Sequence, residues 1–318
     1  MNLALLMDPF DKLVVYRDSS LMIIEAALQQ GMKVFVFESQ DLLLEGAQAF
    51  AHATEVLACD ITKAPQSWYQ MGEKTKRPLK DFGALLIRKD PPFDIDYVFL
   101  TYLLERAEDA GVRVVNSPRA IRDFNEKLVI FNFPQCIAPT IVSSNKEDLR
   151  HFWDEQGEII LKPLDGLGGR NIFHVKQGDT NFTTMLEMLT HHGKRHIMAQ
   201  RYLPEARLGD KRIILLHGKP VPMSLARIPR EGEARANLAS GGRFKAQALT
   251  ERDQWICKEI GPFLKEQGIL FAGLDVIGDF MTEINITSPG CMRELSDATQ
   301  HNLAQVFLNG LIDEASSH

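Results

Sequence analysis

The stretch LKPLDGLGG, residues 161–169, has a lysine at the end of an apolar run and three glycines shortly after it. Loops of this kind commonly bind phosphate through backbone N–H groups. A Walker A loop or a dinucleotide fingerprint would open a helix, and neither pattern is present. The aromatic and β-branched residues in RNIFHV (170–175) instead favour a second strand. The stretch therefore predicts a β-hairpin whose glycines let the backbone fold closely over a phosphate.

Lys162 strengthens the case for a phosphate site. Apolar residues 159–161 precede it and Pro163 follows it. A lysine in such surroundings is seldom buried unless its ammonium group meets an opposite charge. For the glycine loop alone, a hairpin with a purely structural role remains the alternative.

A second hairpin is predicted in AGLDVIGDFMTEINI, residues 272–286, with a turn at Gly278. A two-residue turn would pair Asp275 with Thr282, whereas a turn with one more residue would pair Asp275 with Glu283. Only the second register puts the alternating apolar residues of both strands on one face. Burial of that apolar face selects the second register and the longer turn.

In this register Asp275, Glu283 and Asn285 share the polar face of the hairpin. Two carboxylates opposite one another destabilise a sheet unless a cation lies between them. A hard cation held by few carboxylates together with substrate phosphates is typical of Mg²⁺. The alternative is a solvated polar face on an edge hairpin.

The composition is that of an ordinary globular chain. Its 318 residues suffice for two domains, and its net charge of -6 argues against nucleic-acid binding through bulk electrostatics. No apolar run approaches the roughly 18 residues of a membrane span. The four cysteines have no metal-binding or CxxC spacing. We therefore expect a reduced, cytoplasmic protein without nucleic-acid or membrane partners.

Strand and helix patterns alternate in the first third of the chain. The strands are predicted at 3–7, 33–38, 83–88 and 112–117, and this alternation predicts a parallel α/β sheet. Ligand-contacting residues of such sheets lie at the carboxyl ends of strands, here 7–11, 88–94 and 116–118.

After about residue 120 the pattern changes to strands with few helices, which predicts an α+β region. A helix is expected through NEKLVIFNF, residues 125–133. The longest irregular segment, 228–243, carries several arginines and glycines. We interpret it as a flexible loop that closes over a site and excludes water, and a disordered surface connection remains the alternative.

These motifs resemble the ATP-grasp superfamily, which has a lysine strand, a glycine hairpin and a late Asp…Glu-x-Asn metal site. More narrowly, the chain is similar to the bacterial glutathione synthetase family over nearly its whole length. The segments that carry the resemblance are MDPF (7–10), RKDPPFD (88–94), NEKL (125–128), LKPLDGLGG (161–169), MAQRYLP (198–204), GDKRI (209–213), ARIPREGEARANLASGGR (226–243), GLDVIGD (273–279) and TEINITSPGC (282–291). RKDPPFD and the arginine-bearing loop are not general ATP-grasp features, so they carry the narrower resemblance.

The resemblance implies an N-terminal parallel α/β domain at 1–122 and an ATP-grasp domain at 123–318. Within the latter it implies a lid subdomain at approximately 124–201 and the flexible loop at 228–243.

It also implies roles for individual residues. The expected nucleotide-binding residues are Lys127, Lys162, Gly166, Gly168, Gly169, Gln200, Tyr202, Leu203 and Asp210, and the expected metal ligands are Asp275, Glu283 and Asn285. The expected catalytic residues are Lys162, Arg212 and Arg235, and the expected substrate-binding residues are Arg88, Arg227, Asn237, Arg243 and Arg293.

The activity implied by the family is ATP-dependent ligation of glycine to γ-glutamylcysteine through an acyl phosphate, giving glutathione, ADP and phosphate. Mg²⁺ is the implied cofactor, with Mn²⁺ as a possible substitute, and a homotetramer is the implied assembly. The chemistry needs no protein nucleophile, which agrees with a sequence that has no Ser-His-Asp or Cys-His signature.

Two alternatives remain open. One is another ATP-grasp carboxylate–amine ligase, similar to D-Ala-D-Ala ligase or to a glutamate-adding enzyme, against which RKDPPFD and residues 228–243 argue. The other is an ATP-binding module without catalysis, which would be expected to lack metal ligands that this sequence retains.

Overall fold

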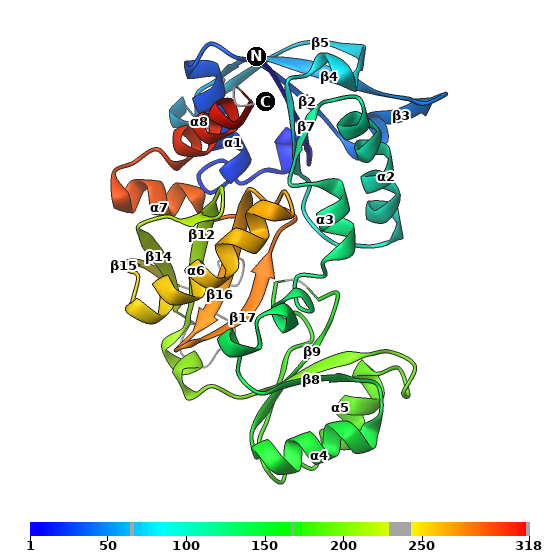
Figure 1. The fold of residues 1–318 in the computed structure, drawn as a ribbon, viewed down its shortest axis with the longest axis vertical. Coiled ribbons are helices and arrows are strands. Elements are labelled where there is room, and N and C mark those ends of the chain that lie inside the picture. Colours follow the sequence, from blue (N-terminus) through cyan, green and yellow to red (C-terminus); the bar gives the residue numbers. More distant parts are fainter. Residues whose placement is uncertain (64–66, 167, 229–242, 316–318) are drawn as a thin grey trace.

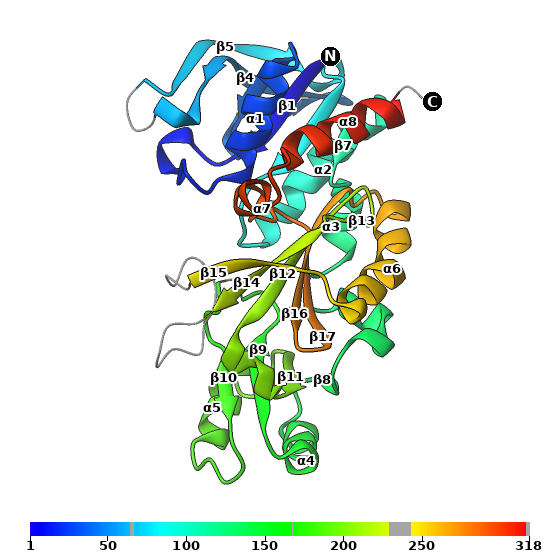
Figure 2. The ribbon, with the colours of Figure 1, turned by 90° about the vertical axis from the view of Figure 1, so that its left-hand side faces the viewer.

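The computed structural model describes residues 1–63, 67–166, 168–228 and 243–315. Within these ranges the strands form three sheets of seven, six and four strands, which follow one another along the long axis of the molecule (Figure 1). The N-terminal sheet lies at one end and the four-stranded sheet at the other (Figure 2). No helix in the described ranges combines the length and apolar character that a bilayer span requires.

Four neighbouring strands of the N-terminal sheet run parallel, as the sequence predicts. In spatial order they are β2 (Lys33–Phe37), β1 (Asn2–Met7), β6 (Ala84–Arg88) and β7 (Arg113–Val115). Alternate residues of β1 enter two different cores. Leu3 and Leu5 pack with α1 (Ser19–Gln29) and α8 (Leu303–Ala315), whereas Ala4 and Leu6 pack with α2 (Ile95–Asp109). Helices therefore cover both faces of the parallel part.

Three antiparallel strands that the sequence does not predict extend this sheet. They are β3 (Leu42–Glu45), β4 (Gln48–Cys59) and β5 (Tyr69–Pro78). In the core that contains α2, β4 buries Ala49, Ala51 and Ala53, and alanine is a poor marker of strands. The edge strand β5 contains no buried residue, so it lacks the apolar alternation that identifies a strand.

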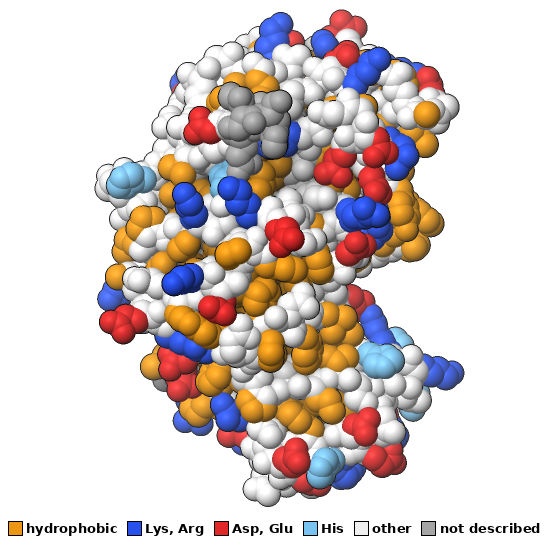
Figure 3. All heavy atoms as spheres, viewed as in Figure 1, with side chains coloured by type: hydrophobic (Ala, Val, Ile, Leu, Met, Phe, Trp, Pro, Cys, Tyr) orange, Lys and Arg blue, Asp and Glu red, His pale blue; other side chains and the backbone are white. Residues whose placement is uncertain are grey.

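The four-stranded sheet contains the glycine hairpin and is antiparallel throughout. Its strands are β10 (Phe173–Val175), β9 (Ile159–Pro163), β11 (Ile197–Arg201) and β8 (Thr140–Ser143), and its helices are α4 (Lys146–Gln156) and α5 (Phe182–Leu189). Phe173 pairs with Leu161, so the predicted hairpin around the glycines is confirmed. Figure 3 shows the molecular outline indented on its right side, between this sheet and the end of α2.

The predicted helix through residues 125–133 is wrong. The structure has short 3₁₀ turns at Val129–Asn132 and Pro134–Cys136 instead. The side-chain oxygen of Asn125 accepts hydrogen bonds from the N–H groups of Lys127 and Leu128, and its carbonyl accepts from Val129 N, so one capped turn forms and then tightens into 3₁₀ geometry. Pro134 then prevents a longer helix from continuing.

The six-stranded sheet lies between the other two. Its strands are β15 (Arg243–Ala248), β14 (Met223–Ile228), β12 (Asp210–Leu216), β16 (Phe271–Ile277), β17 (Phe280–Asn285) and the short β13 (Lys219–Pro220). Ile213 and Leu215 share a core with α6 (Glu251–Glu266), while Ile214 and Leu216 face the core that contains α7 (Met292–Thr299) and α8. The small helix α3 (Pro118–Asp123) connects β7 to the rest of the chain.

Asn116, at the end of β7, joins the N-terminal sheet to the six-stranded sheet. Its buried amide donates to the carbonyls of Phe271 (2.7 Å) and Ile286 (2.6 Å) and accepts from the N–H groups of Leu270 and Phe271 (both 2.9 Å). All four hydrogen-bonding positions of the side chain are thus used. The strand end 116–118, expected to contact a ligand, here provides a structural connection between two sheets.

Replacing Asn116 by alanine should destabilise the fold by roughly 2–4 kcal/mol, because buried backbone groups lose their partners. Urea unfolding followed by tryptophan fluorescence would measure this. Asn2→Ala is the matched control, since Asn2 makes one exposed bond of 3.3 Å to the Asp81 carbonyl. Equal unfolding midpoints for the two variants would contradict the role of Asn116.

Candidate active site

The β16–β17 hairpin sets the geometry of the site. Asp275 pairs with Glu283 and Gly273 with Asn285, as the apolar pattern predicts. The predicted longer turn, however, is wrong. Ile277 pairs with Phe280 across a two-residue turn, and Val276 pairs with Met281. The extra residue is Thr282, which bulges from β17 before Glu283 pairs with Asp275. The sequence reasoning found the correct register but assigned the odd residue to the turn instead of to the strand.

Burial fixes this register. The side chains on the opposite face of the hairpin are almost fully buried: Leu274, Val276, Ile284 and Ile286. Each contributes about 1.5–3 kcal/mol when removed from water. A slip of one residue would expose them and bury the carboxylates, so the polar face keeps its composition.

Asp275 is held by two arginines of neighbouring strands. Arg212 Nε lies 2.6 Å from Asp275 Oδ1 and Arg212 Nη2 lies 3.1 Å from Oδ2, while Arg227 Nη2 lies 2.9 Å from Oδ2. Burial alone would raise the pKa of Asp275, but the two guanidinium groups outweigh it and hold the pKa well below its usual range. Arg227 also binds Asp210 through two hydrogen bonds. The four residues form one alternating network of charges.

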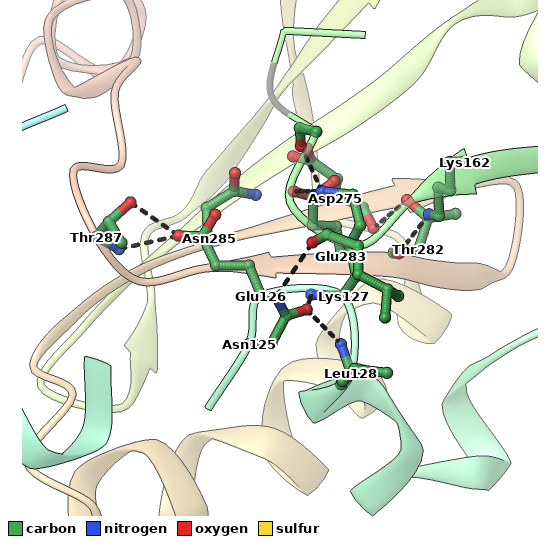
Figure 4. Close-up of polar contacts among 12 residues, drawn as sticks. Asn125, Glu126, Lys127, Leu128, Lys162, Asp275, Thr282, Glu283, Asn285 and Thr287 are labelled. Carbon is green, nitrogen blue, oxygen red and sulfur yellow. Dashed lines mark hydrogen bonds and ion pairs between the residues drawn. The ribbon is translucent and has the colours of Figure 1, made fainter. Parts of the chain in front are cut away.

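Two lysines approach the same hairpin from other parts of the chain (Figure 4). Lys127 Nζ lies 3.2 Å from Glu283 Oε1 and donates to the Gly166 carbonyl at 2.7 Å. Lys162 Nζ donates to the carbonyl of Thr282 at 3.1 Å. Both lysines are buried. The predicted nucleotide-binding lysines and two of the predicted metal ligands thus lie within one cluster.

Glu126 is a site residue that the sequence reasoning missed. Its Oε1 accepts from the N–H groups of Ile286 (2.7 Å) and Thr287 (2.9 Å) and from Thr287 Oγ1 (2.9 Å). Burial, and then the nearby Glu283, raises the pKa of Glu126. A charge immediately before Lys127 was the available signal, but the helix predicted over residues 125–133 gave Glu126 no role.

The glycine loop and the predicted adenine segment lie at the two ends of the four-stranded sheet's inner strands. Gly168 and Gly169 have positive φ angles, and Gly166 leaves no room for a Cβ, which would approach Pro163 Cγ to 2.8 Å. Gln200 is buried at the end of β11, where its amide donates to Thr140. The other predicted nucleotide residues are Tyr202, whose ring stacks on His174, Leu203, which is buried, and Asp210, which binds Arg227.

The remaining predicted substrate residues are more widely separated. Arg88 is buried at the end of β6 and donates to Ser20 Oγ and to the Pro289 carbonyl, both at 3.0 Å. Arg293 is half-buried at the start of α7, and Arg243 is exposed at the start of β15. Arg235 and Asn237, with most of the predicted flexible loop 228–243, lie outside the described residues.

The donor atoms on the polar face suit a hard divalent cation. Glu283 keeps 22% of its side chain exposed and forms an ion pair with Lys127, and Lys162 also lies near it. Asn285 donates its Nδ2 to the Gly273 carbonyl at 3.1 Å, which leaves Oδ1 as an acceptor. Asp275 is the most strongly neutralised of the three, since its oxygens already receive three arginine contacts.

Family models match almost the whole chain. The prokaryotic glutathione synthetase N-terminal domain matches residues 1–122, and the prokaryotic glutathione synthetase ATP-grasp domain matches residues 126–300. The chain belongs to the prokaryotic glutathione synthetase family. The family resemblance and the predicted fold class, an N-terminal α/β domain followed by an ATP-grasp domain, are therefore confirmed.

Individual relatives agree with this assignment. A protein named glutathione synthetase from Pseudomonas syringae pv. tomato is 46% identical over 310 residues, which is 98% of this chain and 96% of that protein. Another of the same name from Pseudomonas aeruginosa is 47% identical over 310 residues, 98% of this chain and 97% of that protein. Membership of this family makes the chain an ATP-dependent ligase of the kind that needs a divalent metal.

Solved structures support the fold at much lower identity. The crystal structure of D-cycloserine synthetase DcsG matches with a TM-score of 0.69 at 14% identity, covering 99% of this chain and 100% of that one. At this identity the likeness describes the ATP-grasp fold and does not extend to the substrate.

Lys162 should make nucleotide affinity depend on pH. Burial, opposed by Glu283, lowers the pKa of Lys162 to about 8. The free protein therefore loses this charge as the pH rises through about 8, and a polyphosphate then binds only after the lysine regains its proton. Affinity for a non-hydrolysable ATP analogue should fall roughly 30-fold between about pH 7 and pH 9.5, as the protonated fraction of Lys162 falls. Isothermal titration calorimetry would measure it.

The control is Lys162→Arg, because a guanidinium stays charged throughout this interval. Its affinity should stay constant with pH, even if it is weaker overall. A wild-type affinity that does not change over the same interval would disprove the assigned protonation behaviour.

Proposed function

We propose that this protein joins glycine to γ-glutamylcysteine at the expense of ATP, releasing glutathione, ADP and phosphate. The observation that carries the proposal is the cluster of Lys127, Lys162, Asp275, Glu283 and Asn285, contributed by three separate parts of the chain. Relatives named glutathione synthetase at 46% and 47% identity support the identity of the substrates.

The chemistry requires a carboxylate to become a good acylating group. An oxygen of the cysteinyl carboxylate attacks the γ-phosphorus of ATP, and ADP leaves. The glycine amine then attacks the acyl carbon of the resulting acyl phosphate, loses a proton, and phosphate leaves. The protein contributes alignment and neutralisation of charge to both steps.

We propose that the nucleotide lies between the glycine hairpin and the β16–β17 hairpin. Lys127 and Lys162 would pair with phosphate oxygens, and the N–H groups around Gly166, Gly168 and Gly169 would bind the same oxygens. The segment from Gln200 to Leu203 would line the base, with Asp210 near the nucleoside. The burial of the cationic side chains of Lys127 and Lys162 in this cluster supports placing the phosphates there.

Mg²⁺ is the proposed metal, with Mn²⁺ as a substitute, and it would supply positive charge to the transferring phosphoryl group. Asp275, Glu283 and Asn285 are the residues that would hold it. Lys127, whose Nζ lies 3.2 Å from Glu283, would exchange Glu283 for a phosphate oxygen when the metal takes Glu283 as a ligand.

Arginines would hold the substrate carboxylates and the oxyanion, since a planar guanidinium pairs well with carboxylates. Arg88 is the strongest candidate: it is buried, yet its bonds go to a hydroxyl and a carbonyl and none in the described ranges goes to a carboxylate. Arg212, Arg227, Arg243 and Arg293 are proposed for the same group of functions, together with Arg235 and Asn237.

We also propose domain limits at 1–122 and 123–318, with a lid subdomain at about 124–201, which the ranges of the family matches and the separate four-stranded sheet support. A cytoplasmic homotetramer is proposed from the family resemblance. Light scattering coupled to size exclusion tests the tetramer, and a monomeric mass would reject it.

The substrate assignment is tested by ADP release with γ-glutamylcysteine and glycine omitted in turn. Release should require both, because without the dipeptide no acyl phosphate forms and without glycine the intermediate is not turned over. D-alanine and glutamate serve as competing substrates. Unchanged release after either omission, or preference for a competitor, would reject the assignment.

Glu283→Gln should lower kcat by roughly 100-fold or more, because an anionic ligand facing the phosphates is lost. The unfolding midpoint should stay unchanged. Glu45→Gln is the matched control, since Glu45 lies exposed on β3 with Lys76 as its partner. Near-normal activity of Glu283→Gln would move the metal site elsewhere.

A further inference from the structure

We propose that Glu126 is a positioning residue that fixes the metal-ligating end of β17 and thereby sets the metal dependence of nucleotide binding. This rests on the proposed function, because it concerns the same metal and nucleotide site. Glu126 itself touches neither, and it acts through the strand that carries Asn285 and Glu283.

The segment around Glu126 is docked along β17. The backbone carbonyl of Glu126 accepts from Ile284 N at 3.0 Å, and its carboxylate receives the next two N–H groups of the strand's continuation. Asn285 is the last residue of β17 and the last that pairs with β16. After Asn285, β16 no longer pairs with the chain, and the carboxylate of Glu126 accepts the next N–H groups instead.

This attachment bears directly on the orientation of Asn285. One side of Asn285 is fixed by its bond to the Gly273 carbonyl, and the backbone that follows it is fixed by Glu126 Oε1. All three donors converge on a single oxygen, and Thr287 Oγ1 is the third. Without that oxygen, two strand-end N–H groups lose their acceptor, and the end of the strand can rotate.

The same short segment also reaches the glycine hairpin. Asn125 Nδ2 donates to the Leu164 carbonyl at 3.1 Å, and Lys127 Nζ donates to the Gly166 carbonyl at 2.7 Å. Residues 125–127 therefore connect the phosphate loop on one side with the metal strand on the other (Figure 4). Glu126 is the attachment on the metal side.

Charge alone does not explain a glutamate here. It lies near Glu283, which repels it, and burial makes its ionised form less favourable still. Its geometric role does explain it, since a long side chain ending in an acceptor oxygen is required. Variants that change the length of the side chain and its charge separately therefore test the role of Glu126.

Glu126→Gln keeps the reach and an acceptor oxygen but removes the charge. Glu126→Asp keeps the charge but shortens the side chain by one methylene. The measured quantity is the Mg²⁺ concentration at half-maximal binding of a fluorescent, non-hydrolysable ATP analogue. For Glu126→Gln we expect a half-maximal Mg²⁺ concentration within about threefold of the wild-type value. For Glu126→Asp we expect a value roughly tenfold higher than wild type, as for other residues that orient metal ligands.

Glu45→Asp, on the exposed edge strand β3, is the matched control and should match wild type. Thermal unfolding of every variant gives the structural readout. If Asp lowers the unfolding temperature without changing the Mg²⁺ midpoint, Glu126 is only structural and the proposal fails. If Gln is the more impaired variant, charge dominates and the proposal also fails. If wild type does not bind the analogue at all, the proposed function fails instead.

Discussion

Repulsion between Asp275 and Glu283, which face each other across β16 and β17, is the constraint that the rest of the site accommodates. Two paired carboxylates are unfavourable unless cations lie close to them. The chain supplies cations from several directions. Arginines come from β12 and β14, and lysines come from β9 and from the connecting segment, residues 125–127. The convergence of sheets on this hairpin therefore follows from electrostatics as well as from apolar burial.

The two carboxylates are neutralised in different ways, and this difference has a chemical consequence. Asp275 is paired with arginines of its own sheet in buried contacts. Glu283 is paired with Lys127, which comes from the irregular segment between sheets, and part of Glu283 remains exposed. Breaking a buried pair costs more than breaking a partly solvated one. In the proposed metal site, Glu283 would therefore be the carboxylate more readily exchanged between a lysine and an incoming divalent cation.

The sequence could predict features that depend on local periodicity. The register of Asp275 with Glu283 follows from alternating apolar residues, and the glycine hairpin follows from strand residues on both sides of the glycines. The bulge was not predictable, because a longer turn and a bulged strand give the same register.

Other features were missed because they depend on contacts between distant residues. The pairing of Arg212 with Asp275 requires β12 to lie beside β16, which no local pattern reveals. Three of the buried residues of β4 are alanines, so its periodicity carries little signal. At Glu126, a helix-compatible sequence forms only a turn, whose carboxylate binds N–H groups of a segment far along the chain, so tertiary contacts override propensity.

Ile286 shows how closely the parts of the site are coupled. Its carbonyl accepts from Asn116 at the end of the N-terminal sheet, and its N–H donates to Glu126 of the connecting segment. Three residues later the carbonyl of Pro289 accepts from Arg88. One short stretch thus runs from Asn285 to the arginine proposed for the peptide carboxylate, held along its length by buried hydrogen bonds. Since phosphoryl transfer needs the carboxylate and the γ-phosphate in contact, one fixed stretch that carries Asn285 and anchors Arg88 reduces the motion that must be frozen on reaching the transition state.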